Sequence, residues 1–223
     1  MNKLVITTVG TSLAGKELKL NDTIRMFIKR LSEENGYNAN QILNNECTEQ
    51  SENANACEIY LKRADLELKD YTAEIASLKL MNLNSDDTVI LLCSDTPDGA
   101  FCGLVNQKYI SETMGINCEL KIIDGLEAKE AKNFLAGLET IIKLLNDTKN
   151  ESIKSEKELI LNITGGYKGV IPFLSLFAKK NKRKIVYLYQ DSELIEIIPD
   201  LIITSKNQNG EETARKDNQQ GLF

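Results

Sequence analysis

The stretch of sequence that decides the fold of this chain is Asn162-Ile163-Thr164-Gly165-Gly166-Tyr167-Lys168-Gly169-Val170-Ile171-Pro172-Phe173. It ends an apolar run, Glu158–Ile163, that has the length and composition of a buried strand. It leads into Gly166–Lys180, where apolar residues recur at helical spacing. A strand that passes through paired glycines into a helix is typical of parallel α/β sheets, which bind ligands beyond the carboxyl ends of their strands.

The sequence on either side extends this pattern of strands and helices. Near-continuous apolar runs, which fit a parallel sheet covered on both faces, predict six strands: Lys3–Val9, Thr88–Cys93, Cys118–Ile123, Glu158–Ile163, Lys184–Tyr189 and Leu194–Ile203. Apolar residues three and four apart predict helices within Asn21–Glu34, Cys57–Leu80, Glu127–Leu145 and Gly166–Lys180. The alternation predicts an α/β fold, Rossmann-like and doubly wound, with a mainly parallel sheet and helices on both faces.

The chain is expected to form one domain over residues 1–204, followed by a polar and flexible tail over residues 205–223. A polar insertion at residues 35–56 is long enough to act as a lid, and Asp147–Glu156 is expected to be a charged connector. Apolar runs fall short of the roughly 18–20 residues of a membrane span. The first apolar stretch fits a strand better than a signal peptide, so we expect a cytoplasmic protein with no membrane contact.

Composition excludes several kinds of chemistry. The chain has no histidine, which removes Ser-His-Asp triads, Cys-His pairs and histidine-ligated metals. Its five cysteines are odd in number and form no CxxC pair, so neither a disulfide framework nor a zinc site is indicated. We expect no metal and no cofactor. The net charge of −6 argues against a broad surface for long nucleic acids, but it permits a small polyanion held by a few donors.

The turn after the fourth strand carries the strongest functional signal. Gly165 and Gly166 let a ligand approach the backbone, and the helix that follows directs free N–H groups toward it. Lys168, expected in the first turn of that helix, is unfavourable there unless an anion offsets its charge. The plain alternative is a solvated lysine beside glycines that serve close packing. Neither a Walker A loop nor a GxGxxG fingerprint occurs.

Two other strand ends offer hydroxyl groups. Val9-Gly10-Thr11-Ser12-Leu13 follows the first strand, and its turn can hold a phosphate or a ribose, or its hydroxyls can simply satisfy the turn itself. Cys93-Ser94-Asp95-Thr96-Pro97 follows the second strand. There Ser94 and Thr96 can face a ligand while Asp95 accepts from a base or ribose, or Asp95 and Thr96 can cap the next helix with Pro97 near its start.

The two turns after the first and fourth strands, taken together and in this order, resemble the CRISPR-associated Rossmann-fold family, called CARF. The resemblance continues through Ile171-Pro172-Phe173-Leu174, through Val186-Tyr187 and through Glu193-Leu194-Ile195-Glu196-Ile197-Ile198-Pro199, and it spans roughly Met1 to Ile203. CARF domains form homodimers that bind cyclic oligoadenylates, the second messengers of type III CRISPR defence. The chain lacks the histidine of an attached HEPN nuclease, so it looks like a stand-alone CARF protein.

Several stand-alone members are ring nucleases, and the resemblance implies a metal-independent phosphodiesterase that opens cyclic tetra- or hexa-adenylate. Residues that match the family's cleavage motifs are Ser12 and Lys168. The ligand-binding set implied is Gly10, Thr11, Ser12, Leu13, Ser94, Asp95, Thr96, Asn162, Thr164, Gly165, Gly166, Tyr167 and Lys168. The first alternative is a non-catalytic cyclic oligoadenylate sensor that signals to a separate effector. The second is a nucleotide-binding α/β enzyme unrelated to CRISPR.

Overall fold

The computed structural model describes residues 1–11, 72–126, 131–189, 193–197, 203–206 and 212–215. These residues form an eight-stranded sheet with the order β3-β2-β1-β4-β5-β6-β7-β8. Neighbouring strands from β3 to β5 are parallel, and those from β5 to β8 are antiparallel. The strands are β1 (Lys3–Thr8), β2 (Thr88–Ser94), β3 (Asn117–Ile123), β4 (Glu158–Asn162), β5 (Lys184–Tyr189), β6 (Glu193–Ile197), β7 (Ile203–Lys206) and β8 (Glu212–Arg215).

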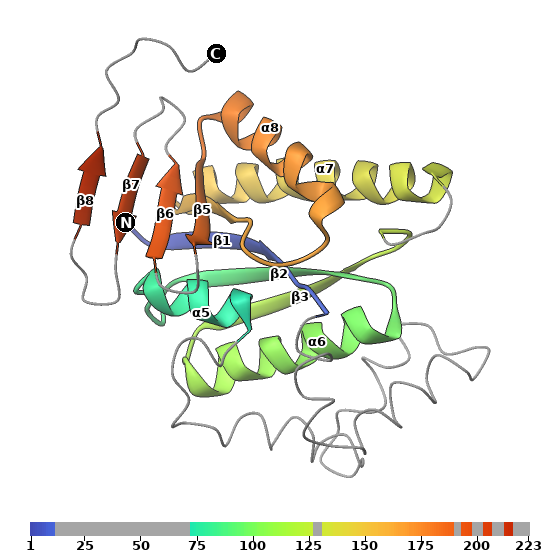
Figure 1. Ribbon diagram of the computed structural model, residues 1–223, viewed down its shortest axis with the longest axis horizontal. Helices are drawn as coiled ribbons and strands as arrows, with labels where there is room; N and C mark the ends of the chain where they lie inside the picture. The colour runs from blue at the N-terminus through green and yellow to red at the C-terminus, as the bar shows by residue number, and fades with distance from the viewer. Residues whose placement is uncertain (12–71, 127–130, 190–192, 198–202, 207–211, 216–223) are drawn as a thin grey trace.

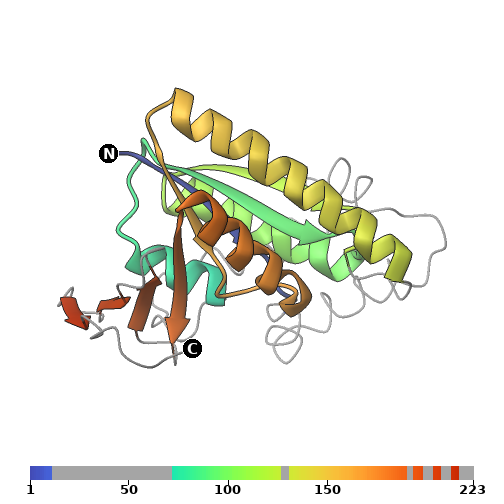
Figure 2. The ribbon, with the colours of Figure 1, turned by 90° about the horizontal axis from the view of Figure 1, so that it is seen from above.

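Helices cover both faces of the parallel strands, which confirms the predicted Rossmann-like α/β fold (Figure 1). On one face lie α5 (Ala73–Leu80) and α6 (Pro97–Lys108), which continues into a π-helical turn, η2 (Tyr109–Thr113). On the other lie α7 (Ala131–Lys154) and α8 (Ile171–Asn181), the latter preceded by a 3-10 turn, η3 (Lys168–Val170). Figure 2 shows α7 and α8 side by side above the strands.

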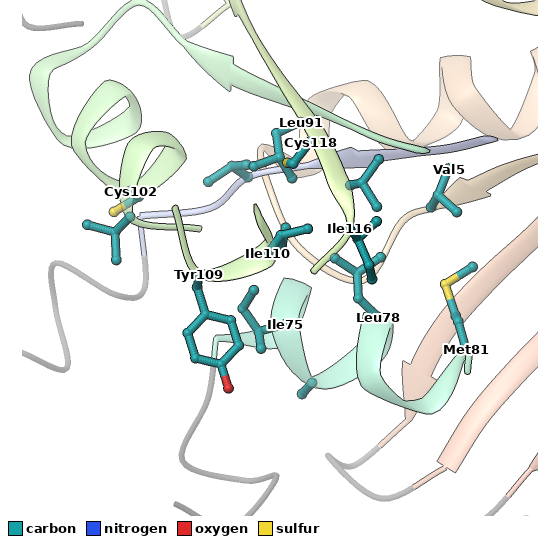
Figure 3. Packing of buried hydrophobic residues seen from close by; sticks show 14 of the residues in the cluster. Val5, Ile75, Leu78, Met81, Leu91, Cys102, Tyr109, Ile110, Ile116 and Cys118 are labelled. Atoms are coloured by element: carbon teal, nitrogen blue, oxygen red, sulfur yellow. The ribbon is translucent and has the colours of Figure 1, made fainter. Parts of the chain in front are cut away.

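Two apolar cores result, one on each face of the sheet. Val5 of β1 packs with Ile75 and Tyr109 in the core under α5 and α6, part of which Figure 3 shows. The next residue of β1, Ile6, packs with Leu174 in the core under α7 and α8. Successive side chains of a strand point to opposite faces, so the continuous apolar run of β1 supplies both cores.

The order of the strands reverses between β1 and β4. From β1 the chain adds β2 and β3 on one side, and it then returns to add β4 and β5 on the other. Open α/β sheets bind ligands outside the carboxyl ends of the strands at such a reversal. The turns that follow β1 and β4 therefore occupy the position expected for a ligand site.

The structure corrects three expectations near the chain's second half. The predicted strand Leu194–Ile203 covers most of β6 and only the first residue of β7, and these two strands pair antiparallel. The expected tail over residues 205–223 contains the end of β7 and all of β8. The expected connector Asp147–Glu156 lies mostly within α7, because small polar residues, Thr148 and Ser152, continue the buried face of that helix.

Other expectations meet the structure only in part. The predicted helix Asn21–Glu34 and the insertion 35–56 lie outside the described residues. Of the predicted helix Cys57–Leu80, residues 72–80 are described: Thr72 is the N-cap, and Ala73–Leu80 form α5. Among the helices that the structure describes, none has the length and apolar character to cross a membrane.

Candidate functional site

The turns after β1 and β4 lie against each other, backbone to backbone. A Cβ atom on Gly10 would lie 3.1 Å from the backbone nitrogen of Gly166. Gly166 has φ +90°, and a Cβ there would lie 2.9 Å from the backbone carbonyl carbon of Thr8. Glycine alone permits both the close approach and the left-handed conformation. The structure thus brings together the two predicted glycine turns.

Two buried polar side chains hold this junction. The hydroxyl of Thr8 donates a hydrogen bond to the carbonyl of Gly165. The carboxylate of Glu74 accepts one from the N–H of Gly10, with a nitrogen–oxygen distance of 2.6 Å. Glu74 is 1% exposed and lies in the first turn of α5. The Gly10 N–H, which the sequence suggested for a phosphate, is therefore already engaged by a carboxylate.

Asn162 and Thr164 fasten the β4 turn to its neighbours. Asn162 is fully buried and donates to Ser77 Oγ of α5 at 2.7 Å. The side-chain oxygen Oδ1 of Asn162 accepts from the Thr164 N–H at 3.2 Å and from the Thr164 hydroxyl at 2.7 Å. Thr164 Oγ1 in turn accepts from the N–H of Leu188 in β5 at 3.0 Å. Both predicted ligand residues thus have a definite structural task in shaping the turn.

Tyr167 and Lys168 are exposed at the end of the same turn. The ring of Tyr167 makes an edge contact with Phe134 of α7, with ring centroids 5.7 Å apart. A Cβ on Gly169 would lie 2.7 Å from Tyr167 Cε1, so this glycine leaves room for the ring. Phe134 and Gly169 therefore fix the tyrosine beside the lysine.

Lys168 opens the 3-10 turn η3 rather than the first turn of an α-helix, because α8 begins at Ile171. Neither η3 nor α8 has a side-chain hydrogen bond at its N-cap. Within the described residues, no carboxylate pairs with the Lys168 ammonium. The Lys168 ammonium therefore lies near the start of α8, where no described side chain caps the helix. A positive charge beside uncapped N–H groups favours binding of an anion.

The turn after β2 follows the plainer alternative for Thr96 but not for Asp95. Thr96 caps α6 by accepting from the Gly99 N–H at 3.1 Å, and the Ser94 and Thr96 hydroxyls are 2.9 Å apart. Asp95 does not cap this helix. It accepts from the N–H of Gly125, beyond β3, at 2.9 Å. Contact of these three residues with a ligand stays a prediction.

The β1 turn is described only as far as Thr11, which is exposed, so Ser12 and Leu13 lie outside the described residues. Among the residues that are described, no group of three His, Cys, Asp or Glu side chains could hold a metal ion. Sequence reasoning missed Thr8 and Glu74. An acidic residue in the first turn of a helix is an ordinary electrostatic preference, so nothing in the local sequence marks Glu74 as part of a site.

The family model for CRISPR-associated protein (Cas_APE2256) matches residues 69–201, more than half of the 223-residue chain. The chain belongs to this Cas_APE2256 family. In this Cas_APE2256 protein the match includes Glu74 and the whole β4 turn, and it begins after the β1 turn. Membership indicates a role in CRISPR defence. No curated protein matches the chain.

Proposed function

We propose that this protein binds a cyclic oligoadenylate at the joined β1 and β4 turns and opens the ring without a metal ion. One observation carries the proposal. At the reversal of the strand order, the Gly10–Thr11 turn contacts the Gly165–Gly166 turn, and the latter ends in the exposed cation of Lys168. Sheets of this kind place ligands at this edge, and membership in a CRISPR-associated family is consistent with such a messenger.

The reaction suits a chain that has no histidine. A ribose 2′-OH of the messenger attacks the adjacent 3′-phosphorus, the bond from phosphorus to the 5′-oxygen of the next nucleotide breaks, and the 2′-OH proton passes to solvent while the leaving oxygen takes one up. The products are a 2′,3′-cyclic phosphate and a 5′-OH. The protein need only align the two oxygens and stabilise the additional negative charge.

Each cleavage residue has one task in this scheme. Lys168 offsets the charge that develops on the phosphorane, and Ser12 positions the phosphate or the attacking hydroxyl. As in the CARF proteins that the sequence resembles, we expect a cytoplasmic homodimer. A two-fold axis matches a ring with an even number of adenylates, because the same residues then contact both halves. Cyclic tetra- and hexa-adenylate both meet that condition.

The test is incubation of the purified protein with labelled cyclic tetra- or hexa-adenylate in the presence of EDTA. We expect linear products that end in a 2′,3′-cyclic phosphate. Lys168→Ala should slow their formation by about 10²–10³-fold, the usual cost of one donor that stabilises a transition state. Lys143→Ala, which removes an exposed lysine of α7, is the matched control and should cleave normally.

The other outcomes separate the alternatives. Tight binding with an intact ring after hours would replace the enzyme by a sensor that signals to a separate effector. Binding of a mononucleotide without binding of either ring would refute the cyclic oligoadenylate assignment altogether.

A further inference from the structure

The first turn of α5 touches both halves of the site. Glu74 accepts from Gly10 after β1, and Ser77 accepts from Asn162 at the end of β4. Ser77 also donates to the Glu74 carbonyl at 2.9 Å, so the two contacts belong to one helical turn. Because β1 and β4 are neighbours in the sheet, this turn spans the point where the strand order reverses.

The Glu74 side chain also occupies the space over Gly165. A Cβ atom on Gly165 would overlap the carboxylate, lying 2.5 Å from Glu74 Cδ and 2.9 Å from Glu74 Cγ. The nearest neighbours of that Cβ all belong to Glu74. A side chain at position 165 would collide with Glu74, so glycine is required there to leave room for the buried glutamate.

A carboxylate with 1% exposure does not reach a ligand, and it would repel a phosphate if it did. Its geometry suits another task. We propose that Glu74 is the positioning residue of the site, because its carboxylate fixes the Gly10–Thr11 turn against the Gly165–Lys168 turn. The expected effect on ring opening rests on the proposed function. The positioning of the two turns rests on the contacts of Glu74 with Gly10 and Gly165.

The test is a double-mutant cycle between Glu74→Ala and Gly165→Ala, with Glu74→Gln as the conservative variant. Glutamine keeps an oxygen that can accept from Gly10, so Glu74→Gln should cleave nearly as the wild type does. Glu74→Ala and Gly165→Ala should each slow single-turnover ring opening by about 10²-fold, the cost of a small misplacement of reacting groups. The double variant should be no slower than either single variant, because alanine at 165 fills space that Glu74→Ala vacates.

A second readout needs no ligand. In the wild type and in Glu74→Gln, the Gly10 amide should exchange its hydrogen slowly with solvent, and in Glu74→Ala it should exchange fast. Glu139→Ala, on the exposed face of α7, is the matched control and should alter neither exchange at Gly10 nor ring opening.

Several results would overturn the inference. They are equal losses in Glu74→Gln and Glu74→Ala, additive losses in the double variant, or lower stability to urea with an unchanged single-turnover rate. A wild-type protein that neither binds nor opens either ring would refute the proposed function instead. The exchange of the Gly10 amide would then still decide whether Glu74 positions the turn.

Discussion

The buried amide of Asn162 provides the sharpest test of how the β4 turn is held. Its side chain donates to Ser77 of α5 and accepts both the N–H and the hydroxyl of Thr164. Asn162→Ala removes these three hydrogen bonds at a fully buried position. The Ser77 and Thr164 hydroxyls then lose a partner, although Thr164 still accepts from Leu188.

The size of the effect follows from these contacts. A hydrogen bond contributes a net of about 0.5–1.5 kcal/mol, and leaving a buried partner unsatisfied costs more than this average. Three bonds give a loss of about 2–4 kcal/mol in the free energy of unfolding. That is a large part of the roughly 5–15 kcal/mol that stabilises an ordinary domain.

The assay is equilibrium unfolding in urea, followed by circular dichroism. We expect a lower midpoint with an unchanged m-value. Asn146→Ala is the matched control, because Asn146 is an exposed residue of α7 whose amide donates to the Ile142 carbonyl of the same helix. That control should stay within about 0.5 kcal/mol of the wild type. A loss below about 1 kcal/mol for Asn162→Ala would refute the account of the turn.

Two further predictions concern the β2–α6 connection and the edge strand β3. Thr96→Ala should lower the free energy of unfolding in urea by about 1–2 kcal/mol, because the Gly99 N–H loses its cap. Thr140→Ala, on the exposed side of α7, is the control and should change this free energy little. Equal losses in the two variants would contradict the role of Thr96 as a cap. Burial and the neighbouring Glu119 raise the pKa of the Cys118 thiol from its ordinary 9.0 to about 12. The unfolded chain therefore releases this proton first, so stability present at neutral pH should decline between pH 9.0 and about 12. Cys118→Ala should flatten that decline in pH-dependent unfolding, and a slope equal to that of the wild type would count against it.

Sequence patterns predicted the parallel strands because burial on both faces demands continuous apolar runs, as in β1 and β2. Apolar periodicity did not mark α6, although Thr96 and Pro97 suggested the start of a helix there. That helix packs through Gly103, where a Cβ would lie 3.2 Å from Cys93 Sγ and even closer to Leu120. A helix that approaches the sheet through a glycine lacks a large apolar side chain at that point, so its apolar periodicity is weak.

The site was predictable where glycines mark turns and unpredictable where a distant side chain completes them. Gly165 and Gly166 follow an evident strand, and their juxtaposition with Gly10 follows from parallel pairing of β1 and β4. Glu74 lies 64 residues from Gly10 in sequence. Only the folded chain shows that this carboxylate is buried between the two turns.

The central place of β1 in the sheet bears on how the protein is made. β1 is synthesised before both of its neighbours, β2 and the much later β4, and its Lys3 is in register with Glu158. Pairing between strands so far apart in sequence raises the contact order and slows folding. A nascent or truncated chain that stops before β4 leaves one edge of β1 open and lacks the Gly165–Lys168 turn of the candidate site. Under the proposed function, premature termination should therefore yield chains that do not bind the messenger at all, rather than chains that bind it weakly.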